Sequence, residues 1–446
     1  MIPRPNVVRR LAVTALAVAT ILALAACSGP TTITVHGKVT DTILTPFGTA
    51  FPGVGANAYI AGTAVPLNPD GTFTISAVQP PYDLIVTVPT WNAAYVYLGL
   101  TRSDPTLSLF TDSSAFFTGD VSLSIGSAVP SGQMGAIVAG STGLVQQPAM
   151  LNAGDGPAIG PITFAWGGEQ NRPVTLYALT AVGSGGGPPT SFTGFGSTTA
   201  TLQDGGTLSG LSINLGSVTN ATMSGSISAP SGYTVDSAGV VLRLGSPTGA
   251  LLGIGPGSGG GATFTGVSVP VHSGIAYGIA GSASNGSGRG TRAWRNVAGP
   301  GSGLTLALPA PAVPTAPASG ATGVGTGTTF RWTPLASAVY LAELTGPSAS
   351  DPDVYVVTGG TSFDLPDLSA VGMSLPSAAS YGYRVLAMGP FASVDAFAGP
   401  SGGTEPYIQL LTLFSTSGIP YGDGNTDASS PVFFTASEAF SFTTAP

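Results

Sequence analysis

The sequence predicts an all-β protein: tandem antiparallel β-sandwich modules that follow a cleaved N-terminal signal helix. Three observations support this fold class. The 446 residues include 66 glycines and 38 prolines, which interrupt helices and mark turns. The segments between them are short runs in which apolar residues alternate with serine or threonine, the pattern of strands with one buried face. Similar strand patterns also recur along the chain, which indicates repeated modules.

The N-terminal segment has the layout of a secretory signal. Arg4, Arg9 and Arg10 precede an apolar run over residues 11–26, and this run ends in small residues just before Cys27. A basic region, an apolar region and small residues in this order are typical of a signal that is cut off. The run is shorter than the about 20 residues that a membrane-spanning helix needs.

The end of this segment, Leu24-Ala25-Ala26-Cys27, resembles a bacterial lipobox. The resemblance implies that residues 1–26 are removed and that Cys27, the one cysteine of the chain, receives a diacylglyceryl thioether. Membrane lipid would then hold the mature chain through Cys27, with residues 27–31 as the tether, and stable anchoring needs more than one acyl chain. Ser28 resembles the residue that favours the outer membrane or cell surface where two membranes exist.

Three related motifs mark the expected first strand of three modules. They read VHGKVT at 35–40, FTGDVS at 117–122 and MSGSIS at 223–228. A glycine inside a strand indicates a bulge or a close backbone approach. Each motif is followed by a Thr-Phe pair in a short alternating strand, which contains Phe73, Phe164 and Phe264. We expect sandwich modules over residues 32–110, 111–216 and 217–308, since two such sheets must cover each other's apolar faces.

The first module shows a family resemblance. GKVTD at 37–41, PGVGANAYI at 52–60, NPDGTFTISAV at 68–78 and YDLIVTV at 82–88 resemble the carboxypeptidase-regulatory-like, transthyretin-like β-sandwich. The resemblance implies a fold and no particular activity.

The pattern changes after residue 308. PAPAVPTAPA at 309–318 predicts an extended, semi-rigid linker. The strands expected in 319–446 resemble a fibronectin type III domain, with Phe330 and Trp332 pointing inward on an early strand. The stretch 395–436 is too long for an ordinary hairpin, and it is compatible with an added hairpin, a binding loop or a disordered excursion.

Charge excludes one class of function. Charged residues make up 7% of the chain, and twelve cations against twenty anions give a formal net charge of −8. A protein with so few cations is poorly suited to neutralise a phosphate backbone, so we expect no nucleic-acid partner.

Motifs for catalysis are weak, and we predict no catalytic residue, no cofactor and no enzymatic activity. GPSGG at 399–403 formally fits a hydrolase elbow around Ser401, yet no histidine follows it. The two histidines, His36 and His272, fall in different modules, and clustered zinc ligands are missing. A catalytic pair of carboxylates can come together in the fold without being close in the sequence. An accessory hydrolase therefore stays as an alternative.

One stretch could hold a metal ion. Asp423, Asn425 and Asp427 alternate in DGNTD, and oxygen ligands at this spacing suit calcium. The competing interpretation is a polar turn, because Phe434 stands where an EF-hand would place its bidentate glutamate.

Aromatic residues suggest a carbohydrate surface. Trp91, Tyr95 and Tyr97 follow the YDLIVTV strand, and we expect Tyr95 and Tyr97 to share one strand face. An exposed platform of this kind would contact polysaccharide; packing in the core is the competing interpretation.

Together these features predict a non-enzymatic, lipid-anchored protein of the bacterial cell envelope. Its β-sandwich modules would serve adhesion, envelope structure or the presentation of a binding domain, with a polysaccharide or an envelope protein as partner. A carbohydrate-binding lipoprotein is the first alternative, and an accessory hydrolase the second.

Overall fold

The computed structural model describes residues 32–40, 55–109, 117–140, 149–166, 170–183, 188–245, 250–254, 261–399 and 431–446. Nearly all of the regular structure in these ranges is β-strand, arranged in stacked sheets, so the predicted fold class is confirmed. None of the helices in the same ranges has the length and apolarity needed to cross a bilayer.

Within the described residues, each of the first three modules has seven strands. In the first module they are β1 (Ile33–Thr40), β2 (Asn57–Ile60), β3 (Thr63–Pro66), β4 (Thr72–Val78), β5 (Tyr82–Val88), β6 (Ala93–Leu100) and β7 (Thr106–Ser108). In the second they are β8 (Phe117–Ser124), β9 (Gln133–Gly140), β10 (Ala149–Leu151), β11 (Ala158–Trp166), β12 (Asn171–Val182), β13 (Ser191–Gln203) and β14 (Thr207–Ser212). In the third they are β15 (Thr219–Ser228), β16 (Thr234–Leu244), β17 (Ala250–Ile254), β18 (Thr263–Val271), β19 (Ile275–Ser284), β20 (Gly290–Val297) and β21 (Leu304–Ala307).

The last module holds the remaining elements. They are β22 (Pro314–Ala316), β23 (Ala321–Val324), β24 (Thr329–Trp332), β25 (Val339–Thr345), β26 (Asp353–Thr358), β27 (Ser362–Asp364), β28 (Ser380–Gly389), β29 (Val432–Ala436) and β30 (Phe440–Thr444), with the short helix α2 (Val394–Phe397). Two 3-10 turns, η1 (Pro89–Trp91) in the first module and η2 (Ser369–Val371) in the last, complete the list.

The same strand order recurs in the first three modules. A three-stranded sheet is built as β4-β1-β7, as β11-β8-β14 and as β18-β15-β21. The opposing four strands run β3-β2-β5-β6, β10-β9-β12-β13 and β17-β16-β19-β20. The hydrophobic alternation read from the sequence therefore folds into one sandwich topology three times.

The motif glycines lie where a side chain would not fit. Gly37 faces Phe73 across β1 and β4, and Gly225 faces Phe264 in the equivalent pair of the third module. A Cβ on Gly37 would lie 2.0 Å from Cζ of Phe73, and a Cβ on Gly225 would lie 2.2 Å from the carbonyl oxygen of Leu304. The expectation of a close approach is confirmed, because the phenylalanine ring occupies the space that the glycine leaves free.

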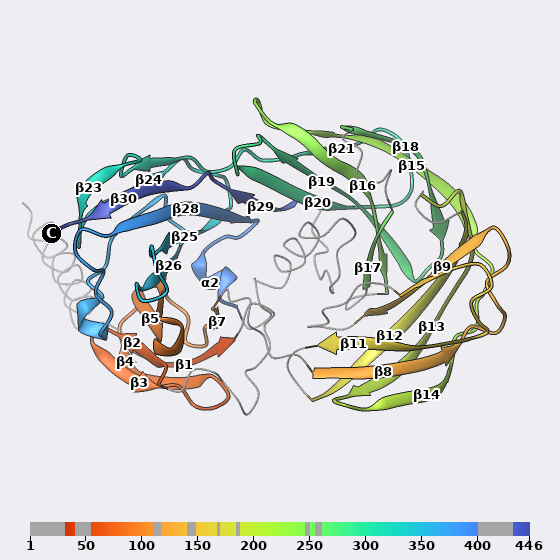
Figure 1. Ribbon diagram of the computed structural model, residues 1–446, viewed down its shortest axis with the longest axis horizontal. Helices are drawn as coiled ribbons and strands as arrows, with labels where there is room; N and C mark the ends of the chain where they lie inside the picture. Colours follow the sequence, from red (N-terminus) through yellow and green to blue (C-terminus); the bar gives the residue numbers. More distant parts are fainter. Residues whose placement is uncertain are drawn as a thin grey trace, which may run out of the picture.

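Three modules share one continuous sheet. A 14-stranded sheet runs through the third, last and first modules in that order, because β29 pairs with β20 and β26 pairs in parallel with β6. Figure 1 shows the four modules along an arc, with the last module between the first and the third. The order in space thus differs from the order along the chain.

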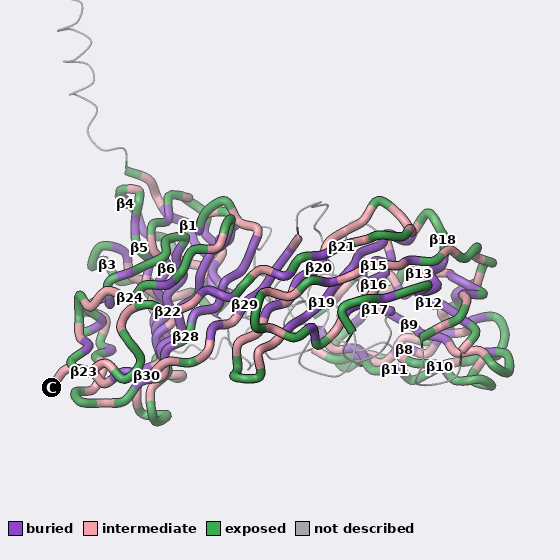
Figure 2. The backbone as a smooth tube through the Cα atoms, turned by 90° about the horizontal axis from the view of Figure 1, so that it is seen from above, coloured by how far each residue is buried: buried purple, intermediate pink, exposed green. Residues whose placement is uncertain are grey.

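The shared sheet is buried on both faces. Ala94 and Val96 of β6 pack into the core of the last module, whereas Tyr95 and Tyr97 pack into the core of the first. Figure 2 shows buried stretches along strands throughout the arc. Alternate residues of one strand therefore serve two different cores.

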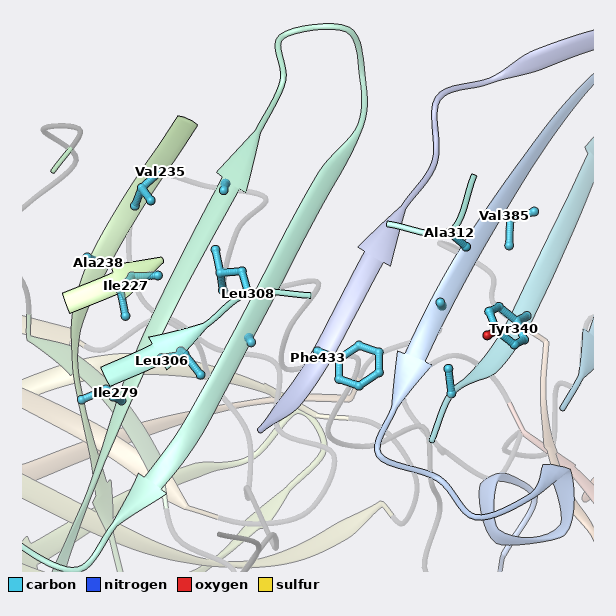
Figure 3. Packing of buried hydrophobic residues seen from close by; sticks show 14 of the residues in the cluster. Ile227, Val235, Ala238, Ile279, Leu306, Leu308, Ala312, Tyr340, Val385 and Phe433 are labelled. Atoms are coloured by element: carbon cyan, nitrogen blue, oxygen red, sulfur yellow. The ribbon is translucent and has the colours of Figure 1, made fainter. Parts of the chain in front are cut away.

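The segment expected to be a linker is partly incorporated into the last module. Pro314–Ala316 forms β22, which pairs with β24, and Ala312 is fully buried. Figure 3 shows Leu308 beside the strands of the third module and Ala312 beside Val385. The proline- and alanine-rich composition suits this role too, since small apolar side chains allow the segment to pack closely across the sheet.

Candidate functional site at the junction of the first and last modules

Four of the predicted site residues lie outside the described residues. They are the lipidation residue Cys27 and the calcium candidates Asp423, Asn425 and Asp427. Both assignments stay predictions. Within the described ranges, histidine, cysteine, aspartate and glutamate side chains form no group of three that could hold a metal ion.

The three aromatic candidates lie at the edge of the first module that meets the last. Trp91 ends η1 and is partly buried. Tyr95 and Tyr97 do share a strand face, but they are only 2% and 0% exposed. The prediction that these tyrosines form an exposed platform is wrong. The reason is that their face of β6 packs into the core of the first sandwich, and the ring of Tyr355 on the neighbouring strand β26 stacks on Tyr95.

Tyr95 contacts a tyrosine of the last module. It stands opposite Tyr355 of β26, and the two rings stack with centroids 4.8 Å apart and planes 9° apart. Burial raises the pKa of Tyr95 well above its usual range, and the neighbouring Tyr355 hydroxyl raises it further. The pair is therefore an un-ionised apolar contact between modules.

A polar pair continues this row of side chains across the last module. Glu343 of β25 lies opposite Tyr355 on one side and Arg384 of β28 on the other. The Arg384 guanidinium donates to the Glu343 carboxylate. Since Arg384 is 52% exposed while Glu343 is 11% exposed, the ion pair forms the solvent-facing end of the row.

A carboxylate also joins the two modules, just after the end of β6. Asp395 in α2 accepts hydrogen bonds from the backbone N–H of Thr101 at 2.8 Å and of Arg102 at 3.2 Å, and also from the Thr101 hydroxyl. Arg102 in turn donates to the Asp395 carbonyl oxygen at 2.6 Å and forms an ion pair with Asp104. Hydrogen bonds to a charged acceptor are stronger than neutral ones, so Asp395 fixes how the modules meet.

The described carboxylates are engaged in structural contacts. Each aspartate and glutamate within the described ranges accepts at least one hydrogen bond from a turn, a neighbouring strand or an arginine. For example, hydrogen bonds from Thr72 hold the pKa of Asp70 below its usual value. Carboxylates held in this way stabilise turns and strand ends through the hydrogen bonds that they accept.

The two histidines have local partners as well. His36 shares a hydrogen bond of 3.2 Å with the hydroxyl of Thr74 on the outer face of β1 and β4. His272 accepts a hydrogen bond from the N–H of Gly274 at 3.0 Å and lies against the ring of Phe195. The structure does not bring these two side chains to one site.

Sequence reasoning missed the residues that form this junction. Asp395 and Thr101 are 294 positions apart, and no local motif links them. The one available signal was composition: β6 reads AAYVYLGL, with apolar residues at both odd and even positions. Such a run is typical of a strand buried on both faces.

Comparisons with known proteins define no family for this chain. No protein-family model and no curated protein matches it. Among solved structures, it is similar to a protein from Bacteroides ovatus ATCC 8483 that is named a "putative adhesin". The identity is 10%, the match covers 46% of this chain and 98% of that one, and the TM-score is 0.15.

Proposed function

We propose that the protein is a non-enzymatic scaffold of the bacterial cell envelope, anchored by lipid at Cys27. The observation that supports the scaffold role best is the continuous sheet, since β20–β29 and β26–β6 pairing joins three modules into one body. Ladder hydrogen bonds and shared cores resist bending in a way that flexible linkers do not. A rigid body of this kind suits adhesion, envelope structure or the presentation of a binding surface.

The anchor places one end of this body near the membrane. Ile33, where β1 begins, is only six positions after Cys27. Since an extended chain advances at most about 3.6 Å per residue, the first module would lie within about 20 Å of an acylated Cys27. Ile33 and Val78 mark the end of the sandwich that would face the lipid, because they pair across β1 and β4.

The strand order supports the family resemblances of two modules. We assign the first module to the carboxypeptidase-regulatory-like sandwiches and the last to the fibronectin type III-like ones. In the last module, β22-β24-β27 opposes a sheet of β26, β25, β28 and β30, which is a two-sheet sandwich.

Localisation of a Cys27→Ser variant tests the anchor. The wild-type chain is expected in the membrane fraction and in the detergent phase after phase partitioning. The variant is expected in the soluble fraction at equal abundance, with its melting temperature unchanged in the purified form. Continued tight membrane association of the variant would refute lipid anchoring.

Polysaccharide remains the partner class to test first. Trp91 is the one aromatic candidate that keeps a partly exposed ring, at the end of the first module opposite Ile33. Pull-down of the purified chain with cell-wall polysaccharide, compared with Trp91→Ala, is the assay. Loss of binding with an unchanged melting temperature supports a carbohydrate site, whereas equal binding by both proteins excludes Trp91 from it.

A further inference from the structure

Each of the three repeated modules begins and ends on neighbouring strands that run in the same direction. β1 pairs in parallel with β7, β8 with β14, and β15 with β21. In the last module, the early strand β23 pairs in parallel with the C-terminal strand β30. The chain therefore enters and leaves each repeated module at opposite ends of one parallel strand pair.

This geometry decides how a module responds to a pull on its two ends. Tension drags the first strand backward and the last strand forward, along their common direction. The pair is sheared, and its interstrand hydrogen bonds, which are evenly spaced in a parallel ladder, carry the load together. In an antiparallel pair the two pulled ends would lie side by side, and tension would open the bonds one after another.

The far end of each pair is fastened in the same way. The residue after the last strand donates its N–H to the last residue of the first strand: Leu109 to Thr40 at 3.1 Å, Ile213 to Ser124 at 2.8 Å and Leu308 to Ser228 at 2.9 Å. The side chains of these three apolar residues are buried in the sandwich cores. A backbone hydrogen bond and a core side chain thus hold the same residue in all three modules.

The outer face of each pair also repeats. A residue of the first strand lies between two threonines of the flanking strands, in the rows Thr72–Lys38–Thr106, Thr163–Asp120–Thr207 and Thr263–Ser226–Thr305. β-branched side chains favour the extended backbone, and cross-strand pairs of this kind stabilise a sheet. The rows therefore reinforce the strands that tension would shear.

We infer that the parallel terminal-strand pairs make the modules resistant to forced unfolding, so that the protein carries tension between its anchor and a partner fixed outside the cell. The inference rests on the proposed function in one respect: the anchor at Cys27 supplies one end of the load. The partner class that fits is an immobile one, such as a polymer network or a neighbouring cell surface.

Directional pulling on the third module tests this inference in the full mature chain. A Cys27→Ser background leaves engineered thiols as the sole handles. Ser217→Cys with Ala310→Cys pulls across β15 and β21 in shear, whereas Ser217→Cys with Ser273→Cys pulls across the antiparallel pair β15 and β18. All three positions are exposed, so the handles should leave the fold intact.

A several-fold higher rupture force is expected for the shear pair than for the antiparallel pair at the same pulling speed, because forced unfolding is governed by the barrier along the pulled direction. Equal melting temperatures of both variants and their parent serve as the control. Equal or lower rupture force for the shear pair would overturn the inference. Since the purified chain carries no lipid, this result is independent of the anchoring test at Cys27.

Discussion

Tyr95 of β6 and Tyr355 of β26 stack across the boundary between the first and last modules, with ring centroids 4.8 Å apart. Their contact joins residues that the sequence separates by two intervening modules. It also turns a residue that we expected on the surface into part of a shared core.

Truncation of this contact should destabilise the whole protein. Tyr95→Ala is expected to lower the free energy of unfolding by about 3–5 kcal/mol, the range for deletion of a large buried aromatic side chain. Tyr95→Phe keeps the ring and should stay close to wild type. Chemical denaturation followed by tryptophan fluorescence measures both, and an alanine variant as stable as wild type would show that the stack contributes little.

Substitutions at Gly37 and Phe73 should have non-additive effects on the free energy of unfolding. Gly37→Ala places a Cβ whose three nearest neighbours are all atoms of the Phe73 ring, the first of them at 2.0 Å. We expect a loss of about 1–3 kcal/mol, typical of overpacking. Phe73→Leu should relieve part of that loss, so that the double variant is more stable than the sum of the single effects.

The equivalent glycine of the third module supplies a control. A Cβ on Gly225 would lie 2.2 Å from the Leu304 carbonyl oxygen as well as 2.6 Å from the Phe264 ring. Phe264→Leu makes the ring smaller but leaves the clash with the Leu304 carbonyl oxygen, because a side-chain substitution does not remove a backbone atom. It should therefore restore little of the stability that Gly225→Ala loses. Equal rescue at both glycines would contradict this account.

Asp395 should matter more than its partial exposure suggests. Asp395→Asn keeps the shape but points an amide N–H₂ group at donors from Thr101 and Arg102. The expected loss is about 1–3 kcal/mol, since hydrogen bonds to a charged group are among the stronger ones. Asp104→Asn is the matched control, because exposed ion pairs contribute at most about 1 kcal/mol. Similar losses for the two variants would remove the special role of Asp395.

The pairing of the first and last modules can be trapped covalently. Ala94 and Val354 are cross-strand partners in β6 and β26. In a purified Cys27→Ser chain, Ala94→Cys with Val354→Cys should form a disulfide on mild oxidation, which electrophoresis without reductant detects. Ala94→Cys with Val356→Cys is out of register by two residues and should stay reduced, because Cα atoms more than about 7 Å apart do not bridge.

One carboxylate should contribute to stability in a pH-dependent way. Hydrogen bonds from the Thr72 side chain and backbone lower the pKa of Asp70 in the folded state below its ordinary value of 3.8. A lowered pKa means stabilisation that is present above the unfolded value and is lost as the pH falls through the folded one. The stability difference between wild type and Asp70→Asn should therefore persist at pH 7 and shrink as the pH falls below the ordinary value of 3.8. A difference that is constant with pH would show that ionised Asp70 is not responsible.

The sequence by itself determined the local structure and the class of fold. Alternating runs such as TFTIS became the strand β4 with Phe73 and Ile75 buried, and the motif glycines marked the close approach to a ring. These features follow from side-chain periodicity and from the space that a glycine leaves, which are properties of a few adjacent residues.

Only the tertiary structure decided which strands are interior and where the modules meet. Tyr95 and Tyr97 are buried because their face of β6 turns to the core of the first sandwich, and Asp395 joins the modules because the chain returns to Thr101 after 294 residues. Pairing at such range depends on the packing of whole sheets rather than on local pattern. For that reason a four-residue stretch is enough to predict a lipid anchor, which stays a prediction, whereas the sheet that joins three modules has no local signal.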